Sequence, residues 1–303
     1  MKQYETIPDY YKAFGHTPPK VDYFDVRPFE QYYEEDASKK TSFDTEPFRV
    51  EFYGIGLLLE GTAKSYLGKS FNANIVFYSP YQVLSWNGVD NNWKGYYTMF
   101  NQDFLSRCSF GATFLSDFPF LRLDNVHPIT VPEQIITELM SIFEKIHTEF
   151  NGENEDKFIM IESYLSILLH HIKRATANVN FEDTDVRSKA EINLLAQYTS
   201  LIESHLAQDE LKAEFFSPSF YADKLNIHAN HLNSVVKRIT NKTAKQIIHG
   251  ALITAAKSLL TQSTLSIKEI AYQLGFEEPA HFNNLFKKHT GLTPSQYRQI
   301  SNL

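Results

Sequence analysis

The pattern of apolar positions changes character along the chain. Between about residues 21 and 123, short β-branched and aromatic runs such as NIVFYSP and WKGYYTMF are separated by Gly, Asn and Pro. Runs of this kind are typical of antiparallel strands in a barrel or sandwich. After residue 132 the apolar positions recur at the spacing of amphipathic helices. The pattern therefore predicts an α+β protein of two domains, with an N-terminal antiparallel β-barrel or sandwich and an all-α C-terminal part.

Two helices are predicted within about 133–175. The polar stretch NGENED separates them, so we expect an antiparallel helical hairpin. One face of the hairpin is apolar and can pack on the barrel or on a second subunit. We predict a homodimer whose contacts are Leu139, Phe143, Ile146, Leu165, Leu169 and Ile172.

A polar stretch without periodicity, residues 176–189, is predicted to be a linker. It would separate a regulatory domain, 1–175, from a C-terminal domain, 190–303. Single cores stop growing at roughly 250 residues, so a chain of 303 residues is expected to form two domains.

The C-terminal domain repeats itself at an offset of 50 residues. At this offset Leu232 aligns with Phe282, and Val236 aligns with Phe286. Further upstream the offset is 49, so one turn is longer by one residue. A unit that recurs in this way predicts two copies of one supersecondary element.

Each copy is predicted to be a helix-turn-helix. In the second copy, Ser266 and Glu269 suit a capping box, Gly275 ends the first helix, and Pro279 opens the next. The helical stretch KQIIHGALITAAKSLL lies between the copies and would hold them at a fixed separation. Both second helices are then expected to enter major-groove segments about 34 Å apart on one face of DNA.

The charge is distributed unevenly along the chain. The whole chain has a formal net charge of -7, but residues 212–303 hold eleven Lys or Arg and five Asp or Glu, which is +6. The rest of the chain therefore carries -13. A basic end on an acidic body indicates that the C-terminal part meets a polyanion.

The second copy carries a family resemblance. The stretch IKEIAYQLGFEEPAHFNNLFKKHTGLTPSQYR, within roughly 190–303, resembles the signature of AraC/XylS-type transcription regulators nearly throughout. The resemblance implies a domain that binds a double-stranded DNA operator, and activation by contact with RNA polymerase. The N-terminal part is similar to that family's cupin-type regulatory domain in its strand pattern and in the hairpin that follows.

Exposed side chains near the start of the second helix of each copy are candidates for reading bases. From this geometry and the family's base-reading positions, we predict base contacts by Asn230, His231, Asn233, Ser234, Ala280, His281, Asn283 and Asn284. Many relatives carry Arg where this chain has Ser234 and Asn284, so guanine readout is not expected at those positions. Backbone phosphates are expected to meet Lys237, Arg238, Lys287, Lys288 and Arg298.

Aromatic side chains on the predicted strands suggest a pocket for a small organic effector, such as a sugar or a phenolic compound. The predicted lining is Arg49, Tyr53, Tyr66, Tyr78, Trp86, Trp93 and Tyr97. The alternative is a domain that binds no small molecule and only dimerises or contacts another protein.

No catalytic residue, metal or cofactor is predicted. Cys108 is the only cysteine, and we expect it to be a buried small residue. A metal-dependent cupin enzyme is a further alternative, which the sequence disfavours because His16 and His127 are the only histidines in the first 146 residues. No signal peptide and no run of about 18 apolar residues occurs, so we expect a cytoplasmic protein without a membrane segment.

Overall fold

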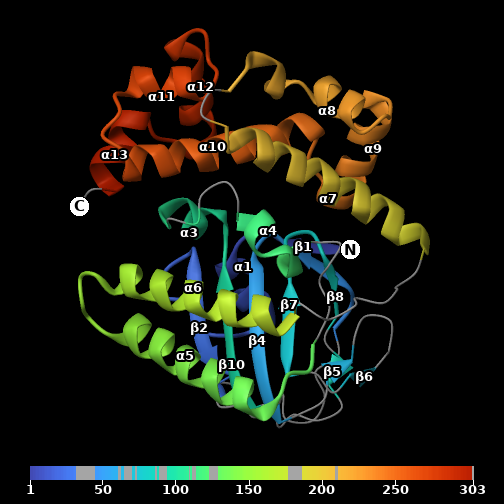
Figure 1. Ribbon diagram of the computed structural model, residues 1–303, viewed down its shortest axis with the longest axis vertical. Coiled ribbons are helices and arrows are strands. Elements are labelled where there is room, and N and C mark those ends of the chain that lie inside the picture. Colours follow the sequence, from blue (N-terminus) through green and yellow to red (C-terminus); the bar gives the residue numbers. More distant parts are fainter. Residues whose placement is uncertain are drawn as a thin grey trace. The chain divides into compact units, whose positions relative to one another are not determined.

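The computed structural model in Figure 1 describes residues 1–31, 45–60, 63–64, 70–71, 74–85, 87–88, 94–108, 110, 114–122, 129–176, 186–208 and 211–301. The chain divides into two compact units. The N-terminal unit holds Met1–Phe104 and Phe118–Asp183, and the C-terminal unit holds Leu105–Asp117 and Thr184–Leu303. None of the helices in the described ranges is long and apolar enough to cross a membrane.

The described strands of the N-terminal unit lie in three sheets. An antiparallel sheet has the order β2 (Phe24–Pro28), β10 (Lys94–Phe100), β4 (Tyr53–Glu60) and β7 (Ile75–Tyr78). A second sheet has the order β1 (Lys2–Tyr4), β3 (Phe48–Val50) and β8 (Val83–Leu84). A third has the order β6 (Ser70–Phe71), β5 (Ala63–Lys64) and β9 (Asn87–Gly88).

The predicted β-rich N-terminal part is present, but the predicted antiparallel barrel is not closed in the part of the chain that the structure describes. The described strands form separate sheets, and β1 pairs with β3 in parallel, with Lys2 opposite Phe48. The physical reason is that a run of alternating side chains marks a strand but not its neighbour. A strand from the start of the chain can thus join a sheet in a direction that its own residues do not reveal.

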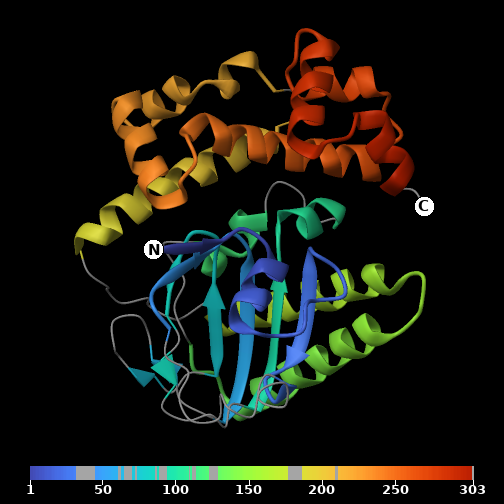
Figure 2. The ribbon, with the colours of Figure 1, turned by 180° about the vertical axis from the view of Figure 1, so that it is seen from behind.

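The helices of the N-terminal unit include a pair that covers one face of the four-stranded sheet. These are α5 (Glu133–Asn151) and α6 (Lys157–Thr176), which lie side by side in both views (Figures 1 and 2). The ring of Phe24 on β2 lies 5.4 Å from that of Phe150 on α5. The ring of Tyr96 on β10 stacks on that of Phe143, with the centroids 6.1 Å apart. The apolar face of the hairpin is thus part of the core.

This packing corrects the predicted dimer interface. The six proposed contacts are at most 1% exposed within the single chain: Leu139, Phe143, Ile146, Leu165, Leu169 and Ile172. Helical periodicity predicted the apolar face, but the face packs inside the unit. Buried side chains cannot contact a second subunit without unfolding the hairpin.

The opposite face of the four-stranded sheet packs against α1 (Ile7–Phe14) and the β1–β3–β8 sheet. Their shared core is aromatic and includes Tyr10, Phe48, Tyr78 and Tyr97. A side chain at Gly54 would place its Cβ atom 1.9 Å from the ring carbon Cζ of Tyr78. Only glycine at this position leaves room for the tyrosine ring to cross the strand. Along the chain, shorter helices lie between β10 and α5: α3 (Gln102–Arg107), α4 (Phe114–Asp117) and η3 (Pro119–Leu121). Of these, α4 and the end of α3 belong to the C-terminal unit.

The C-terminal unit is helical. Besides α4 and the end of α3, its described elements are α7 (Val186–Leu206), η4 (Ala213–Phe216), α8 (Pro218–Lys224), α9 (Ala229–Thr240), α10 (Ala244–Gln262), α11 (Ile267–Gln273), α12 (Pro279–Thr290) and α13 (Pro294–Ser301). The first repeat is α8–α9 and the second repeat is α11–α12. Within this unit, α10 runs from one repeat to the other (Figure 1).

The two repeats share backbone conformations as well as side chains. Asn226 follows the first helix of the first repeat with φ 54°, and Gly275 has φ 79° at the equivalent place. The second helices end in the same way, at Asn241 (φ 58°) and Gly291 (φ 76°). Gly and Asn are the residues that adopt this left-handed region most readily. The predicted tight turns are therefore present in both copies.

Side-chain caps are repeated too. Thr243 and Gln246 form a capping box at the start of α10, and Thr293 accepts in the same way from the backbone N–H of Gln296 at the start of α13. The predicted capping box of Ser266 and Glu269 is confirmed. The duplicated sequence thus specifies duplicated local structure.

The two glycines that end helices of the second repeat provide a matched test. A Cβ atom at Gly275 would lie 2.7 Å from the carbonyl oxygen of Leu211, whereas one at Gly291 would meet nothing within 4 Å. We expect Gly291→Ala to lower the free energy of unfolding by about 1–2 kcal/mol through its positive φ alone. Gly275→Ala should cost a further ~1–3 kcal/mol because the carbonyl must also move. Urea denaturation followed at 222 nm checks this, and equal losses would contradict it.

Candidate DNA-binding surface

Helix α9 presents a polar face beside buried anchors. Leu232, Val235, Val236 and Ile239 are buried against the rest of the unit. Among the predicted base-reading residues, those that are exposed in this helix are Asn230, His231 and Ser234. The fourth, Asn233, is half-buried. The face available to a DNA groove in the first repeat is thus narrower than the sequence predicted.

Asn233 has a structural partner. Its Oδ1 accepts a hydrogen bond of 3.0 Å from the backbone N–H of Ala244, the first residue of α10. The carbonyl oxygen of Ala244 accepts in turn from the buried Tyr198 hydroxyl at 2.8 Å. A bidentate contact to adenine needs both the oxygen and the nitrogen of an amide. Since the oxygen of Asn233 is engaged, we infer that this residue positions α9 against α10.

Helix α12 repeats the anchors but not this bond. Phe282 and Phe286 are buried, while Asn283 and Asn284 are exposed. The residue equivalent to Ala244 is Pro294, which opens α13 and has no backbone N–H to donate. The second repeat therefore leaves the amide of Asn283 available. The other predicted residues in this helix, Ala280 and His281, are also exposed.

The predicted phosphate contacts divide into two groups. Lys237, Lys287 and Lys288 are exposed. Arg238 is paired with Glu191 of α7, to which its Nε donates at 2.9 Å and its Nη2 also donates. Arg298 is half-buried, and its Nε donates to the carbonyl oxygen of Leu260 in the last turns of α10 at 3.1 Å. Both arginines thus have partners within the unit, which the basic pattern alone did not predict.

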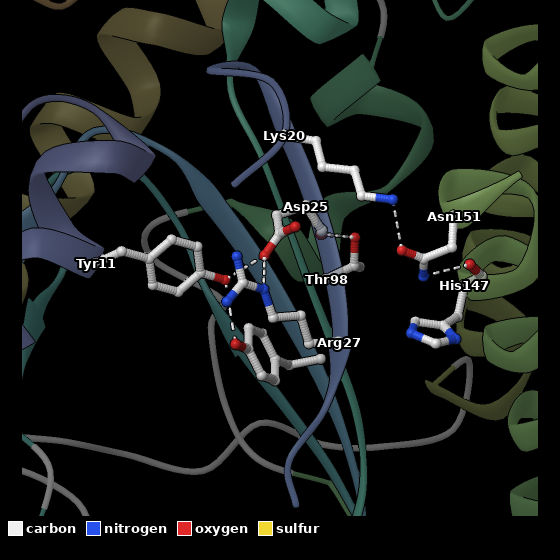
Figure 3. Close-up of polar contacts among 8 residues, drawn as sticks. Tyr11, Lys20, Asp25, Arg27, Thr98, His147 and Asn151 are labelled. Carbon is white, nitrogen blue, oxygen red and sulfur yellow. Dashed lines mark hydrogen bonds and ion pairs between the residues drawn. The ribbon is translucent and has the colours of Figure 1, made fainter. Parts of the chain in front are cut away.

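The interior of the N-terminal unit holds a polar cluster that the sequence analysis missed (Figure 3). Asp25 and Arg27 lie on the same side of β2, and Arg27 Nε donates to Asp25 Oδ2 at 2.7 Å. The Tyr11 hydroxyl donates to the same oxygen at 2.5 Å and lies 3.1 Å from the Tyr97 hydroxyl. The signal was a pair of charged residues two apart in the otherwise apolar strand FDVRP.

Burial dominates the electrostatics of this cluster. It raises the pKa of the Asp25 carboxyl, and Arg27 and Tyr11 offset that effect only in part. Burial likewise raises the pKa of Tyr97. On the other face of the sheet, Lys20 donates to Asn151, whose Nδ2 donates to the carbonyl oxygen of His147 (Figure 3). Within the buried cluster, the charge of Asp25 is paired with Arg27.

The structure does not bring the predicted pocket residues together. Tyr78 and Tyr97 share the aromatic core, but Tyr53 stacks on Phe100 with ring centroids 5.4 Å apart. Arg49 alternates along β3 with Phe48 and Val50, both in the core, so it points away from that core. Tyr66, Trp86 and Trp93 lie outside the described residues.

Two further predictions concern reactive or metal-binding groups. Cys108 is buried and is not in a disulfide, as expected of a small core residue. Across the described ranges, no three His, Cys, Asp or Glu side chains are grouped in a way that could hold a metal ion.

The contrast between Asn233 and Asn283 gives a stability test. Asn233→Ala leaves the Ala244 N–H without its acceptor, and we expect a loss of about 1 kcal/mol in the free energy of unfolding. Asn283→Ala should change it by less than about 0.5 kcal/mol, because that side chain is exposed. Asn233→Asp keeps the acceptor oxygen and should restore most of the loss. Thermal unfolding of the three variants checks this, and equal stability of Asn233→Ala and wild type would contradict it.

Comparison with known proteins adds the family. A family model described as a helix-turn-helix domain matches residues 221–300. The melibiose operon regulatory protein of Escherichia coli K12 is 32% identical over 80 residues, which is 26% of this chain and 26% of that protein. The HTH-type transcriptional activator RhaR of Salmonella arizonae is 43% identical over 63 residues, or 21% of this chain and 22% of that protein.

Other matches differ in length. Histidine kinase P4 of Formosa agariphila is 25% identical over 173 residues, which is 55% of this chain and 13% of that protein. Among solved structures, the C-terminal domain of AraT, a response regulator from Geobacillus stearothermophilus, is 25% identical, with a TM-score of 0.32. That match covers 35% of this chain and 84% of the other. The chain spans less than two thirds of the length of each of these three curated relatives.

The family model and the operon regulators match the C-terminal part of this chain, where the sequence predicts helix-turn-helix repeats. The family model covers α9 through α12, the elements that carry the predicted base-reading faces. The C-terminal part of this chain is an AraC-type helix-turn-helix domain.

Proposed function

We propose that the protein is a sequence-specific transcription activator of the cytoplasm that binds an operator through both helix-turn-helix repeats. One observation carries the proposal: each repeat buries its apolar anchors and exposes Asn and Lys side chains on its second helix. Amide side chains suit adenine in the major groove, and lysines suit phosphates. Activation would proceed by contact with RNA polymerase, as the family resemblance implies.

The two repeats would contribute unequally to base reading. In the first repeat, Asn233 is engaged with α10, which leaves Asn230, His231 and Ser234 to face the groove. In the second repeat, Asn283 and Asn284 are both exposed. We therefore assign the stronger sequence preference to the second repeat.

A small organic ligand would bind in the N-terminal unit, beside the buried cluster of Tyr11, Asp25, Arg27 and Tyr97. Polar groups that converge within an aromatic interior are the features by which small-molecule sites fix orientation. The alternative is a unit that binds no ligand and only mediates protein contacts. A homodimer would need an exposed surface, such as the outer side of α6, where Ile159 is 67% and Ile167 is 45% exposed.

DNA recognition is tested with a duplex recovered by selection from a random-sequence library, and with a scrambled duplex of the same composition. Asn283→Ala should weaken binding to the selected duplex by about 1–3 kcal/mol and relax one base pair of the selected motif. Lys287→Ala should weaken both duplexes alike and lower the slope of log affinity against log salt by about 0.9. Fluorescence anisotropy measures both effects.

The matched control is Lys173→Ala, which removes an exposed lysine from α6, outside the C-terminal unit. It should leave affinity and salt slope unchanged. A wild-type protein that recovers no preferred sequence would show that the proposed function is wrong.

Ligand binding is tested by thermal unfolding in the presence of sugars, aromatic acids and lipophilic metabolites. A compound at about 100 times its Kd should stabilise the protein by roughly 2.7 kcal/mol. Tyr97→Phe removes a hydroxyl of the interior cluster and should reduce the shift. Tyr96→Phe is the control, because the ring of Tyr96 stacks on Phe143 at the other face of the sheet, away from the cluster. Absence of any shift would favour the ligand-free alternative.

A further inference from the structure

Two histidines meet where the two repeats approach α10. The ring of His249, on α10, lies edge-on to the ring of His289, in the last turn of α12, with centroids 5.8 Å apart. His249 is half-buried, and His289 is at the surface. This pair was not among the residues that the sequence analysis selected.

The first repeat has no histidine at the position equivalent to His289. The residue equivalent to His289 in the first repeat is Ile239, which is buried and packs as a core anchor. The second repeat thus replaces an apolar anchor with an ionisable ring. A packing role alone does not require this change, since the apolar residue serves the same place in the first repeat.

The surroundings of the two rings are cationic. Lys288, on α12, acts on both rings. Lys245, on α10, acts on His249, and Lys242, in the connection between α9 and α10, acts on His289. In the first repeat, the cation equivalent to Lys288 is Arg238, which is neutralised by Glu191. Lys288 forms no ion pair with any residue in the described part of the chain.

In the free protein, the charged form of each ring is disfavoured. Burial is the largest cause, and together with Lys245, His289 and Lys288 it lowers the pKa of His249 to about 4. Burial, with Lys288 and Lys242, also lowers the pKa of His289. A nearby anion would reverse the sign of the local field and favour the charged form of each ring.

The position fits the DNA backbone. Lys288 lies one helical turn after Asn284, on the same side of α12 as that exposed base-reading candidate. Lys242 follows the second helix of the first repeat, so the cluster draws side chains from both repeats and from the helix between them. Phosphates that lie between two major-groove segments are the anions expected at such a place.

We propose that His249, His289, Lys242, Lys245 and Lys288 hold a backbone phosphate of DNA between the two repeats, and that DNA binding is accompanied by proton uptake on the histidine pair. This inference rests on the proposed function. The histidine pair then has a higher pKa in the DNA-bound protein than in the free protein. Affinity for DNA therefore rises as the pH falls from the bound pKa to the free pKa. Each proton taken up adds a slope of up to about one in log affinity per pH unit.

The test uses the full chain and a duplex selected from a random-sequence library. Isothermal titration calorimetry near pH 6, in two buffers of different ionisation enthalpy, gives the number of protons taken up on binding. The double variant His249→Gln/His289→Gln should take up close to one proton fewer than wild type. His170→Gln removes an exposed histidine of α6 and should leave the uptake unchanged. Lys288→Gln should lower the salt slope by about 0.9 on selected and scrambled duplexes alike.

Sequence-specific binding with the same proton uptake in the double variant as in wild type would overturn the inference and leave the proposed function intact. A second readout does not depend on the fold of the variants: NMR titration of the wild-type histidines should place the pKa of His249 higher with duplex than without. If inorganic phosphate raises the pKa values of the pair and the duplex does not, the assignment to the DNA backbone is wrong. A wild-type protein that binds no duplex would instead refute the proposed function.

Discussion

The geometry of the DNA-binding surface depends on how helix α10 is held at its two ends. At its first residue, the N–H of Ala244 donates to Asn233 and the carbonyl oxygen accepts from Tyr198. Near its last turn, the carbonyl oxygen of Leu260 accepts from Arg298. Each bond joins α10 to a different helix: α9, α7 and α13. A long helix fixed in this way sets the distance between the repeats, and therefore which two groove segments they can reach together.

The same bonds explain why the two copies of one sequence pattern have diverged. The first repeat uses Asn233 and Arg238 for contacts within the protein, with Ala244 and Glu191. The second repeat has a proline where the first has Ala244, and its equivalent of Arg238 is a lysine without an acidic partner among the described residues. Its polar side chains therefore remain available for DNA. Both copies thus keep an exposed polar face, and the first copy uses part of its polar side chains for contacts within the protein.

Whether the sequence predicts an interaction depends on how far apart its two residues lie along the chain. The capping box of Ser266 and Glu269, the turn at Gly275 and the anchors Phe282 and Phe286 involve neighbours within a few residues, and all were predicted. The pair of Arg238 with Glu191 spans 47 residues, and no local pattern indicates it.

The helical hairpin and the predicted pocket also show that local patterns do not predict which surfaces pack together. Periodicity gives the apolar face of a helix but not the surface that it covers, so the core contacts of Leu139 and Leu165 were predicted as dimer contacts. Strand alternation gives two faces but not which one is inside. Tyr97 and Tyr53 were therefore placed in one pocket, although they lie on opposite faces of the sheet.

The central claim is that both repeats engage one DNA molecule at the same time. Hydroxyl-radical footprinting of wild type on a selected duplex tests it directly. The account predicts two protected segments on one face of the duplex, with centres about 10–10.5 base pairs apart. Protection of a single segment, or of two segments on opposite faces, would contradict it.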